Sequence, residues 1–282
     1  MRWKGRKESS NVEDRRGMSF KGKGMVGGGI GTIAIVLVVL LLGGDPTSIL
    51  QNVQLDDQTT NSNYTETAED KELAQFVGVV LAETESVWHA IFKEAGSTYR
   101  EPKLVLFSGK VESACGVAGA STGPFYCPGD EKLYIDLSFF EELQKRFKAP
   151  GDFAMAYVIA HEVGHHIQKL TGVMDKMNDL RSRVSKEEYN QYSVRVELQA
   201  DFYAGIWVHY TEQQDLLESG DLEEALNAAS AVGDDNIQKQ AQGYVVPESF
   251  THGTSAQRKK WFYKGFTSGD IRQGDTFETR DL

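Results

Sequence analysis

The alternation of apolar and polar positions predicts several helices and two short strands in the chain. From residue 71 to 95, apolar residues recur every three or four positions, which is the pattern of an amphipathic helix. Two short apolar runs, 103–107 and 132–137, are bounded by turn residues and predict strands. The pattern of the chain after these runs predicts helices and loops. We therefore expect an α+β fold that is mostly helical and has a small β-sheet.

Another predicted helix, Phe153 to Leu170, is apolar on almost every side before it reaches the pentapeptide His161-Glu162-Val163-Gly164-His165. Positions i and i+4 share a helix face, so His161 and His165 can bind one metal ion. Glu162 then projects beside the metal, where a water molecule would sit. This is the His-Glu-x-x-His arrangement of zinc peptidases, with two ligands and a general base. The alternative is a buried helix with two ordinary histidines.

A third metal ligand is predicted on a later helix, because a catalytic zinc ion usually has three protein ligands and one open position. A capping box at 185–188 opens this helix, which runs to about residue 210. Glu197 and Asp201 share one of its faces, among apolar neighbours. We predict that Glu197 is the ligand and that Asp201 orients a ligand histidine through its free ring N–H. The alternative is an acidic face in contact with water.

The remaining histidines considered are predicted to be structural: His89, His166 and His209.

The last predicted helix, 256–266, is preceded by a polar segment that contains His252. A peptidase needs hydrogen-bond donors for the oxyanion that forms during attack on the carbonyl. His252 and Arg258 are the candidate catalytic donors, with Tyr244 as a third. The alternatives are helix capping or an ion pair for His252, and a buried pair with Asp or Glu for Arg258.

Three segments, 161–168, 197–205 and 252–258, together resemble the bacterial neutral zinc metallopeptidase family. The opening residues 1–6 and the region of Cys115 are also similar to that family, so the resemblance covers nearly the whole chain. It implies a zincin-like domain of the gluzincin type, and one membrane segment near the N-terminus. It implies no particular substrate. The zinc ligands that the resemblance implies are His161, His165 and Glu197.

The N-terminal part of the chain has a different pattern. Residues 24–44 carry no charge, and about 20 helical residues span a hydrocarbon core of roughly 30 Å. Residues 1–23 hold eight Lys or Arg against three Asp or Glu, which predicts a basic cytoplasmic tail by the positive-inside rule. Residues 45–68 are polar and predict a linker. We therefore expect one signal-anchor helix in a bacterial inner membrane, with the metallopeptidase domain, 69–282, on the extracytoplasmic side. The alternative is a cleavable signal peptide.

Charge and cysteine content restrict the possible partners. The net charge is −11, and subtracting the +5 of residues 1–23 leaves −16 on the rest. Such an acidic domain binds nucleic acid poorly, so we expect no nucleic-acid partner. Cys115 and Cys127 are the only cysteines, and outside the cytoplasm they are predicted to form one disulfide. The sequence predicts no oligomeric state.

The function predicted from these observations is a membrane-anchored zinc peptidase acting on peptide or protein substrates. Zinc activates a water molecule, and Glu162 is the general base. Zincins commonly hold a peptide by β-addition to an edge strand, and the run 132–137 is the expected strand. The alternatives are a membrane-anchored binding or assembly factor and a chaperone-like quality-control protein, with a structural or vestigial zinc site. Glu162 favours the peptidase, because a structural site needs no base.

Overall fold

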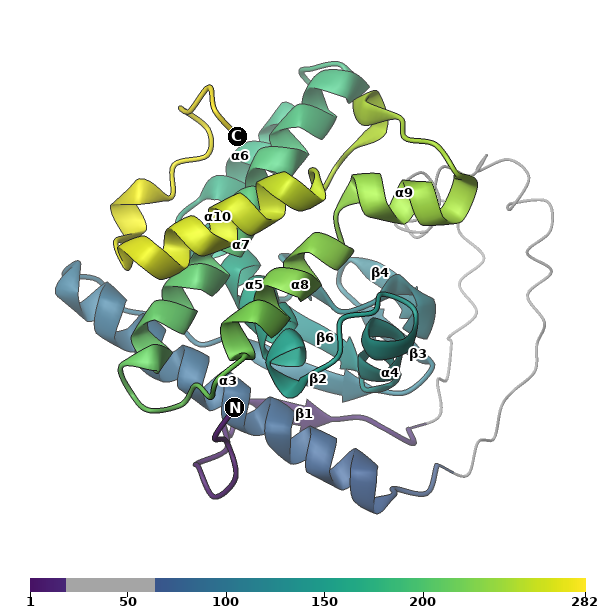
Figure 1. Cartoon of the computed structure of the whole chain (residues 1–282), viewed down its shortest axis with the longest axis vertical. Helices are drawn as coiled ribbons and strands as arrows, with labels where there is room; N and C mark the ends of the chain where they lie inside the picture. Colours follow the sequence, from purple (N-terminus) through teal and green to yellow (C-terminus); the bar gives the residue numbers. More distant parts are fainter. Residues whose placement is uncertain (19–63) are drawn as a thin grey trace.

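The computed structural model describes residues 1–18 and 64–282 as an α+β fold in which helices predominate (Figure 1). Short 3₁₀ turns lie at Ala120–Thr122, Pro247–Ser249 and Ile271–Gln273. The helices of the described residues are α3 (Ala68–Glu94), α4 (Ser138–Lys145), α5 (Asp152–Leu170), α6 (Val173–Leu180), α7 (Lys186–Glu212), α8 (Asp221–Ala231), α9 (Asp234–Gln242) and α10 (Ser255–Ser268).

The four predicted helices are confirmed as α3, α5, α7 and α10, with ends that differ by a few residues. The side chain of Ser185 accepts a hydrogen bond from the backbone N–H of Glu188 and begins α7 as predicted. The start of α5 differs from the expectation. Gly151, at φ +113°, is its N-cap residue, and Asp152 is the first residue of the helix. A carboxylate in the first turn still favours the helix through its dipole.

The main sheet has four strands in the order β1-β2-β6-β5. β1, β2 and β6 are parallel, and β5 is antiparallel to β6. A separate antiparallel pair, β3 and β4, follows β2 in the chain. The two predicted strands are confirmed as β2 and β6. The bounds are β1 (Val12–Asp14), β2 (Lys103–Phe107), β3 (Lys110–Ser113), β4 (Gly116–Gly119), β5 (Phe125–Cys127) and β6 (Lys132–Asp136).

The expectation that the run 132–137 forms the edge of the sheet is wrong, because β6 lies between β2 and β5. The edge strand on this side is β5, which has only three residues and follows a segment rich in Gly and Ser. A strand this short has too few positions to show a period of two, so its apolar pattern gives no signal. β1, β3 and β4 were missed for the same reason.

Residues 1–18 pack on the domain, which differs from the expectation of a separate basic tail over residues 1–23. Asn11 accepts a backbone hydrogen bond from Leu104 at 2.9 Å, and Leu106 accepts one from Arg15 at 2.8 Å. The side chain of Met1 is only 6% exposed and belongs to the main hydrophobic core. The described part of the predicted tail is therefore built into the fold.

The predicted signal-anchor, 24–44, lies outside the described residues, as does most of the predicted linker, 45–68. Within the parts of the chain that the structure describes, no helix combines the length and the apolar character needed to cross a bilayer.

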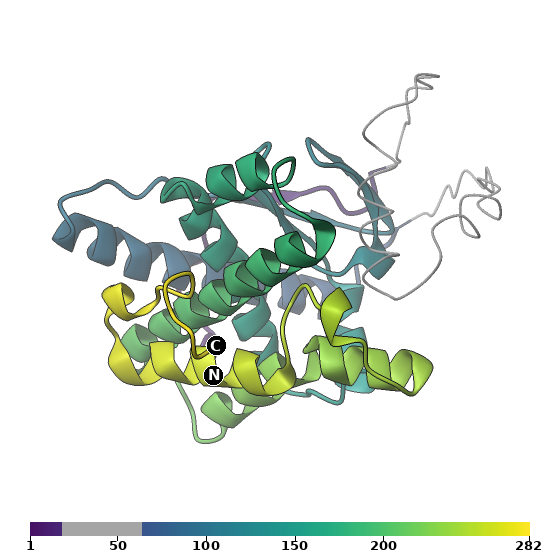
Figure 2. The ribbon, with the colours of Figure 1, turned by 90° about the horizontal axis from the view of Figure 1, so that it is seen from above.

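Close contacts between backbones fix the helices that carry the predicted site. A Cβ atom at Gly164 of α5 would lie 2.9 Å from the carbonyl oxygen of Ala200 in α7. On the other side of α7, a Cβ atom at Gly205 would lie 2.0 Å from the carbonyl oxygen of Phe262 in α10. Only glycine allows these approaches, and they set α5, α7 and α10 against one another (Figures 1 and 2).

Candidate metal centre

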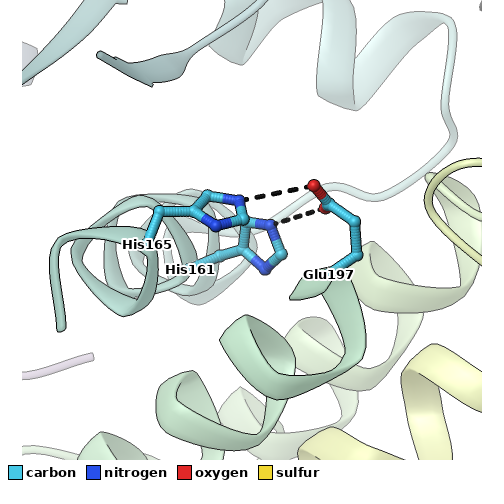
Figure 3. Close-up of side chains that lie close together, drawn as sticks. All are labelled: His161, His165 and Glu197. Atoms are coloured by element: carbon cyan, nitrogen blue, oxygen red, sulfur yellow. Dashed lines mark hydrogen bonds and ion pairs between the residues drawn. The ribbon is translucent and has the colours of Figure 1, made fainter. Parts of the chain in front are cut away.

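Three side chains from two helices converge on one point. His161 and His165 share a face of α5, and Glu197 of α7 lies opposite them (Figure 3). The two carboxylate oxygens of Glu197 are 3.2 Å from Nε2 of His161 and 3.5 Å from Nε2 of His165. In a tetrahedral zinc site with bonds of about 2.0–2.1 Å, ligand atoms lie about 3.3 Å apart. Each distance involves a different oxygen of Glu197, and one ligand atom from each of the three residues lies within 4.8 Å of the others, so the three side chains can share one zinc ion.

Asp201 contacts the ring nitrogen of His161 that does not face Glu197. Its Oδ1 atom is 2.8 Å from Nδ1 of His161, one turn of α7 away from Glu197. Because a carboxylate at neutral pH only accepts hydrogen bonds, Nδ1 of His161 carries a proton, and Nε2 is the ring nitrogen left to bind a metal once it has lost its own proton. This contact has the geometry predicted for Asp201, and a carboxylate in this position fixes the orientation of the ring.

Gln168 orients the second histidine and was not singled out from the sequence. Its Oε1 atom accepts a hydrogen bond from Nδ1 of His165 at 2.9 Å. Its amide nitrogen donates to the carbonyl oxygen of Val196 at 2.7 Å, which fixes which end of the amide faces the histidine. Gln168 lies three residues after His165, so the helical spacing could have identified it. Both histidines therefore direct Nε2 toward Glu197.

The charges around this point favour a cation. Burial lowers the pKa of His161, but the carboxylates of Asp201 and Glu197 outweigh it and raise the pKa to about 9. Burial raises the pKa of Glu197, yet His165, His252 and His161 together hold it well below its usual range. The pKa of Asp201 is also lowered, because Arg258 and His161 outweigh the burial of this carboxylate. The carboxylates of Glu197 and Asp201 thus stay ionised beside the histidines.

Glu162 lies beside the three converging side chains, in the wall of the same cleft. It is 8% exposed, and no residue that the structure describes donates a hydrogen bond to its carboxylate. A buried carboxylate without a protein partner is available to accept a proton from a molecule in the cleft. This position corresponds to the predicted general base.

His252 lines this cleft as well, and Asp234 holds it there. Nδ1 of His252 is 3.1 Å from Oδ1 of Asp234, while Oδ2 of Asp234 accepts backbone N–H groups from Thr251, His252 and Gly253. Burial lowers the pKa of His252, but the carboxylates of Glu197 and Asp234 raise it overall. The protonated imidazole can therefore donate from Nε2 into the cleft.

Arg258 also borders the cleft, but its hydrogen bonds are made to protein groups. Its Nε atom donates to Oδ2 of Asp201 at 2.7 Å, Nη2 donates to Oδ1 at 2.9 Å, and Nη1 donates to the carbonyl oxygen of Val232 at 3.1 Å. Only 3% of the residue is exposed. This geometry favours the alternative reading of Arg258, a buried ion pair with an aspartate, over a catalytic donor. Tyr157 completes the cluster by donating its hydroxyl to Asp201.

We expect the Arg258→Met substitution to lower the free energy of unfolding by about 3–5 kcal/mol, because it leaves the buried carboxylate of Asp201 without its cation. Urea unfolding measures this loss. The control is Arg272→Met, which removes an exposed guanidinium whose partner is Asp270 two residues away, and it should leave the unfolding midpoint unchanged. Equal midpoints for Arg258→Met and the native chain would contradict a structural role for Arg258.

The cleft has a volume of about 420 Å³ and lies between β5 and the helices of the site. Its wall includes residues 121–124, so the loop between the two cysteines borders the cleft. The predicted disulfide is present: Cys115 and Cys127 are bonded and join the β3–β4 turn to the end of β5. Tyr126 of β5 is tied to α5 as well, because its hydroxyl is 3.0 Å from Nδ1 of His166.

The other polar candidates lie away from the converging side chains. Nε2 of His166 donates to the carbonyl oxygen of Arg100 at 2.6 Å, which completes its buried structural role. His209 contacts the carbonyl oxygen of Phe266, and His89 pairs with Glu101. Tyr244 is 62% exposed and does not line the cleft. The predictions that His89, His166 and His209 are structural agree with these contacts.

Comparison with known proteins shows the family of the chain. The family described as "Putative neutral zinc metallopeptidase" matches residues 1–277. The uncharacterized protein YpfJ of Escherichia coli K12 is 49% identical over 285 residues, which cover 98% of this chain and 99% of YpfJ. The uncharacterized protein Rv2575 of Mycobacterium tuberculosis H37Rv is 39% identical over 257 residues, 86% of each chain. No solved structure matches. The chain belongs to the neutral zinc metallopeptidase family.

Proposed function

We propose that this protein is a zinc-dependent peptidase that hydrolyses peptide bonds with Glu162 as the general base. The observation that carries the proposal is the convergence of His161, His165 and Glu197 at the spacing of zinc ligands, with Glu162 in the same cleft. These three side chains would hold the ion through two imidazole nitrogens and a carboxylate oxygen. When bound, zinc supplies a Lewis acid that lowers the pKa of a water molecule and polarises the scissile carbonyl.

Glu162 then takes a proton from the attacking water and passes it to the amine that leaves. Attack on the carbonyl creates an oxyanion, and a donor already positioned for it stabilises the transition state. His252 supplies this donor in our proposal, since Asp234 fixes one ring nitrogen and leaves the other free for the cleft. Arg258 acts through Asp201 and His161 as a positioning residue.

We propose that the substrate is a peptide in extended conformation, held along β5. This strand pairs with β6 on one side only, and among the described residues no strand pairs with its other edge. Phe125 and Tyr126 of β5 line the cleft that contains Glu162. An unpaired strand edge beside a catalytic group can bind an extended peptide by main-chain hydrogen bonds. The disulfide at Cys127 and the contact of Tyr126 with His166 keep this edge in place.

We expect His252→Ala to lower kcat by about 10²–10³ with little change in KM, because an oxyanion donor acts on the transition state more than on bound substrate. Steady-state kinetics on a cleaved peptide measure both values, and the melting temperature shows whether the variant folds. The control is His89→Ala, which removes an exposed imidazole that does not line the cleft. Native kcat in folded His252→Ala would rule out the donor role.

Zinc dependence tests the proposed function. The full-length protein is stripped with a chelator, reloaded with one equivalent of zinc and incubated with a mixed peptide library. We expect cleavage by the reloaded protein and none by the stripped protein. A protein that binds one zinc ion at this site and cleaves no peptide in the library would contradict the proposal.

We also propose that the apolar stretch 24–44 attaches the protein to a membrane and that the domain acts in an extracytoplasmic compartment. The uncharged, apolar character of the stretch supports the first part. The disulfide supports the second, since disulfides persist in oxidising compartments.

A further inference from the structure

We propose that residues 1–18 and residues 64–282 lie on the same side of the membrane. The charge pattern of the sequence predicts the opposite: a cytoplasmic tail and an extracytoplasmic domain, separated by one crossing at 24–44. The proposal rests on the contacts between the two described parts of the chain. It is independent of the peptidase activity.

The first observation is that residues 1–18 complete the sheet of the domain. Val12, Glu13 and Asp14 pair in register with residues 104–106 of β2 (Figure 1). The carboxylate of Glu13 accepts a hydrogen bond from Lys132 of β6 at 3.0 Å. On the other side of the segment, the ring of Trp3 packs edge-on against Phe76 of α3, with ring centres 5.5 Å apart. These contacts can form only if residues 1–18 and residues 64–282 lie in the same compartment.

The second observation is the position of the two chain ends that flank residues 19–63. Nη2 of Arg16 is 2.8 Å from a carboxylate oxygen of Glu66, and Nη1 donates to the hydroxyl of Tyr64 at 3.0 Å. Nη1 also donates to the carbonyl oxygen of Asp70 at 3.1 Å. A hydrocarbon core is roughly 30 Å thick, about ten times these distances. The two described chain ends that flank residues 19–63 therefore lie next to each other on the domain.

The third observation explains the basic residues that suggested a cytoplasmic tail. Several of them form ion pairs with the acidic domain, although surface pairs like these contribute only about 0–1 kcal/mol each. Residues 1–18 hold six Lys or Arg, and the pairing gives four of them a role within the fold, where they complement acidic groups of residues 64–282. The pairs are Arg2–Asp215, Lys4–Glu72, Arg6–Glu83 and Arg16–Glu66.

A single membrane crossing would break every one of these contacts. The ladder of β1 would be lost, the side chain of Met1 would leave the core, and the outer edge of β2 would be exposed. The match of the family also begins at residue 1, so residues 1–18 belong to the unit that the family shares. One placement satisfies all of these observations: both described parts on one face of the membrane.

Cysteine labelling of the full-length chain in bacterial cells tests the proposal. Cys115 and Cys127 are replaced by serine, and a single cysteine is introduced at Lys7 or at Lys259, both exposed. A membrane-impermeant maleimide is added to spheroplasts before and after permeabilisation. We expect the two positions to give the same pattern, labelled in both states or only after permeabilisation. Labelling of one position in intact spheroplasts and of the other only after permeabilisation would overturn the proposal.

A second measurement uses both native cysteines, in case their loss prevents folding. The purified full-length chain is compared with Arg16→Glu, Glu66→Arg and the double variant. We expect Arg16→Glu to lower the melting temperature and the double variant to recover part of that loss, because the exchanged charges meet across the junction. Losses that simply add would show no energetic coupling between residues 16 and 66, and this would contradict the proposal whatever the peptidase activity.

Discussion

Replacing Glu162 by Gln is expected to lower the rate of peptide hydrolysis by about 10²–10⁴-fold, the usual contribution of general acid–base catalysis. The amide keeps the shape of the side chain but cannot accept the proton of the attacking water. One zinc ion should stay bound per chain, because Glu162 is not among the three converging ligands. Turnover of a peptide substrate and the zinc content of the same sample measure the two effects.

The matched control is Glu141→Gln, which makes the same change on the exposed face of α4, where the carboxylate pairs with Lys145. It should retain native turnover. If a pure, zinc-loaded Glu162→Gln preparation hydrolysed the peptide at the native rate, Glu162 would not be the base and the mechanism would be wrong.

The second large effect is expected for Glu197→Ala, which removes the only proposed ligand from α7. Loss of contacts that merely support a ligand costs about 10–100-fold in metal affinity, so removal of the ligand itself should cost more than about 100-fold. Hydrolysis should fall to background with the metal. Zinc affinity is measured by competition with a chromophoric chelator.

His209→Ala is the control for this variant, because His209 lies on the same helix and contacts the carbonyl oxygen of Phe266. It should bind zinc as the native chain does. Zinc loss in His209→Ala together with native affinity in Glu197→Ala would mean that the ligand set is wrong.

The parts of the fold that were predicted from sequence are those with long, regular patterns. α3, α5 and α7 each extend over at least 19 residues, so a long amphipathic or apolar stretch and helix start signals identify them. The pairing of His161 with His165 follows from helix geometry alone. β1 and β5 have three residues each, and their pairing depends on partners elsewhere in the chain, so no local signal identified them.

The site was only partly predictable, because several of its contacts join residues far apart in the sequence. Arg258 reaches Asp201 across 57 positions, and Tyr126 reaches His166 across 40. Residue types show that such side chains need partners, but they do not say which residues those partners are.

The basic residues near the N-terminus show the same limit of prediction from sequence. Positive charge predicts retention in the cytoplasm, yet it equally suits ion pairs with an acidic domain, and only the three-dimensional contacts of residues such as Arg16 separate the two.

Incorporation of solvent oxygen into cleaved peptides tests the central claim, zinc-dependent hydrolysis by Glu162, most directly. Zinc-loaded full-length protein is incubated with a peptide library in water enriched in ¹⁸O, and the products are analysed by mass spectrometry. The account predicts new peptides that carry one ¹⁸O at the new carboxyl terminus, formed by the native chain and absent with the stripped protein and with Glu162→Gln. An intact library after incubation with native chain that holds one zinc ion, or equal labelled products from Glu162→Gln, would contradict it.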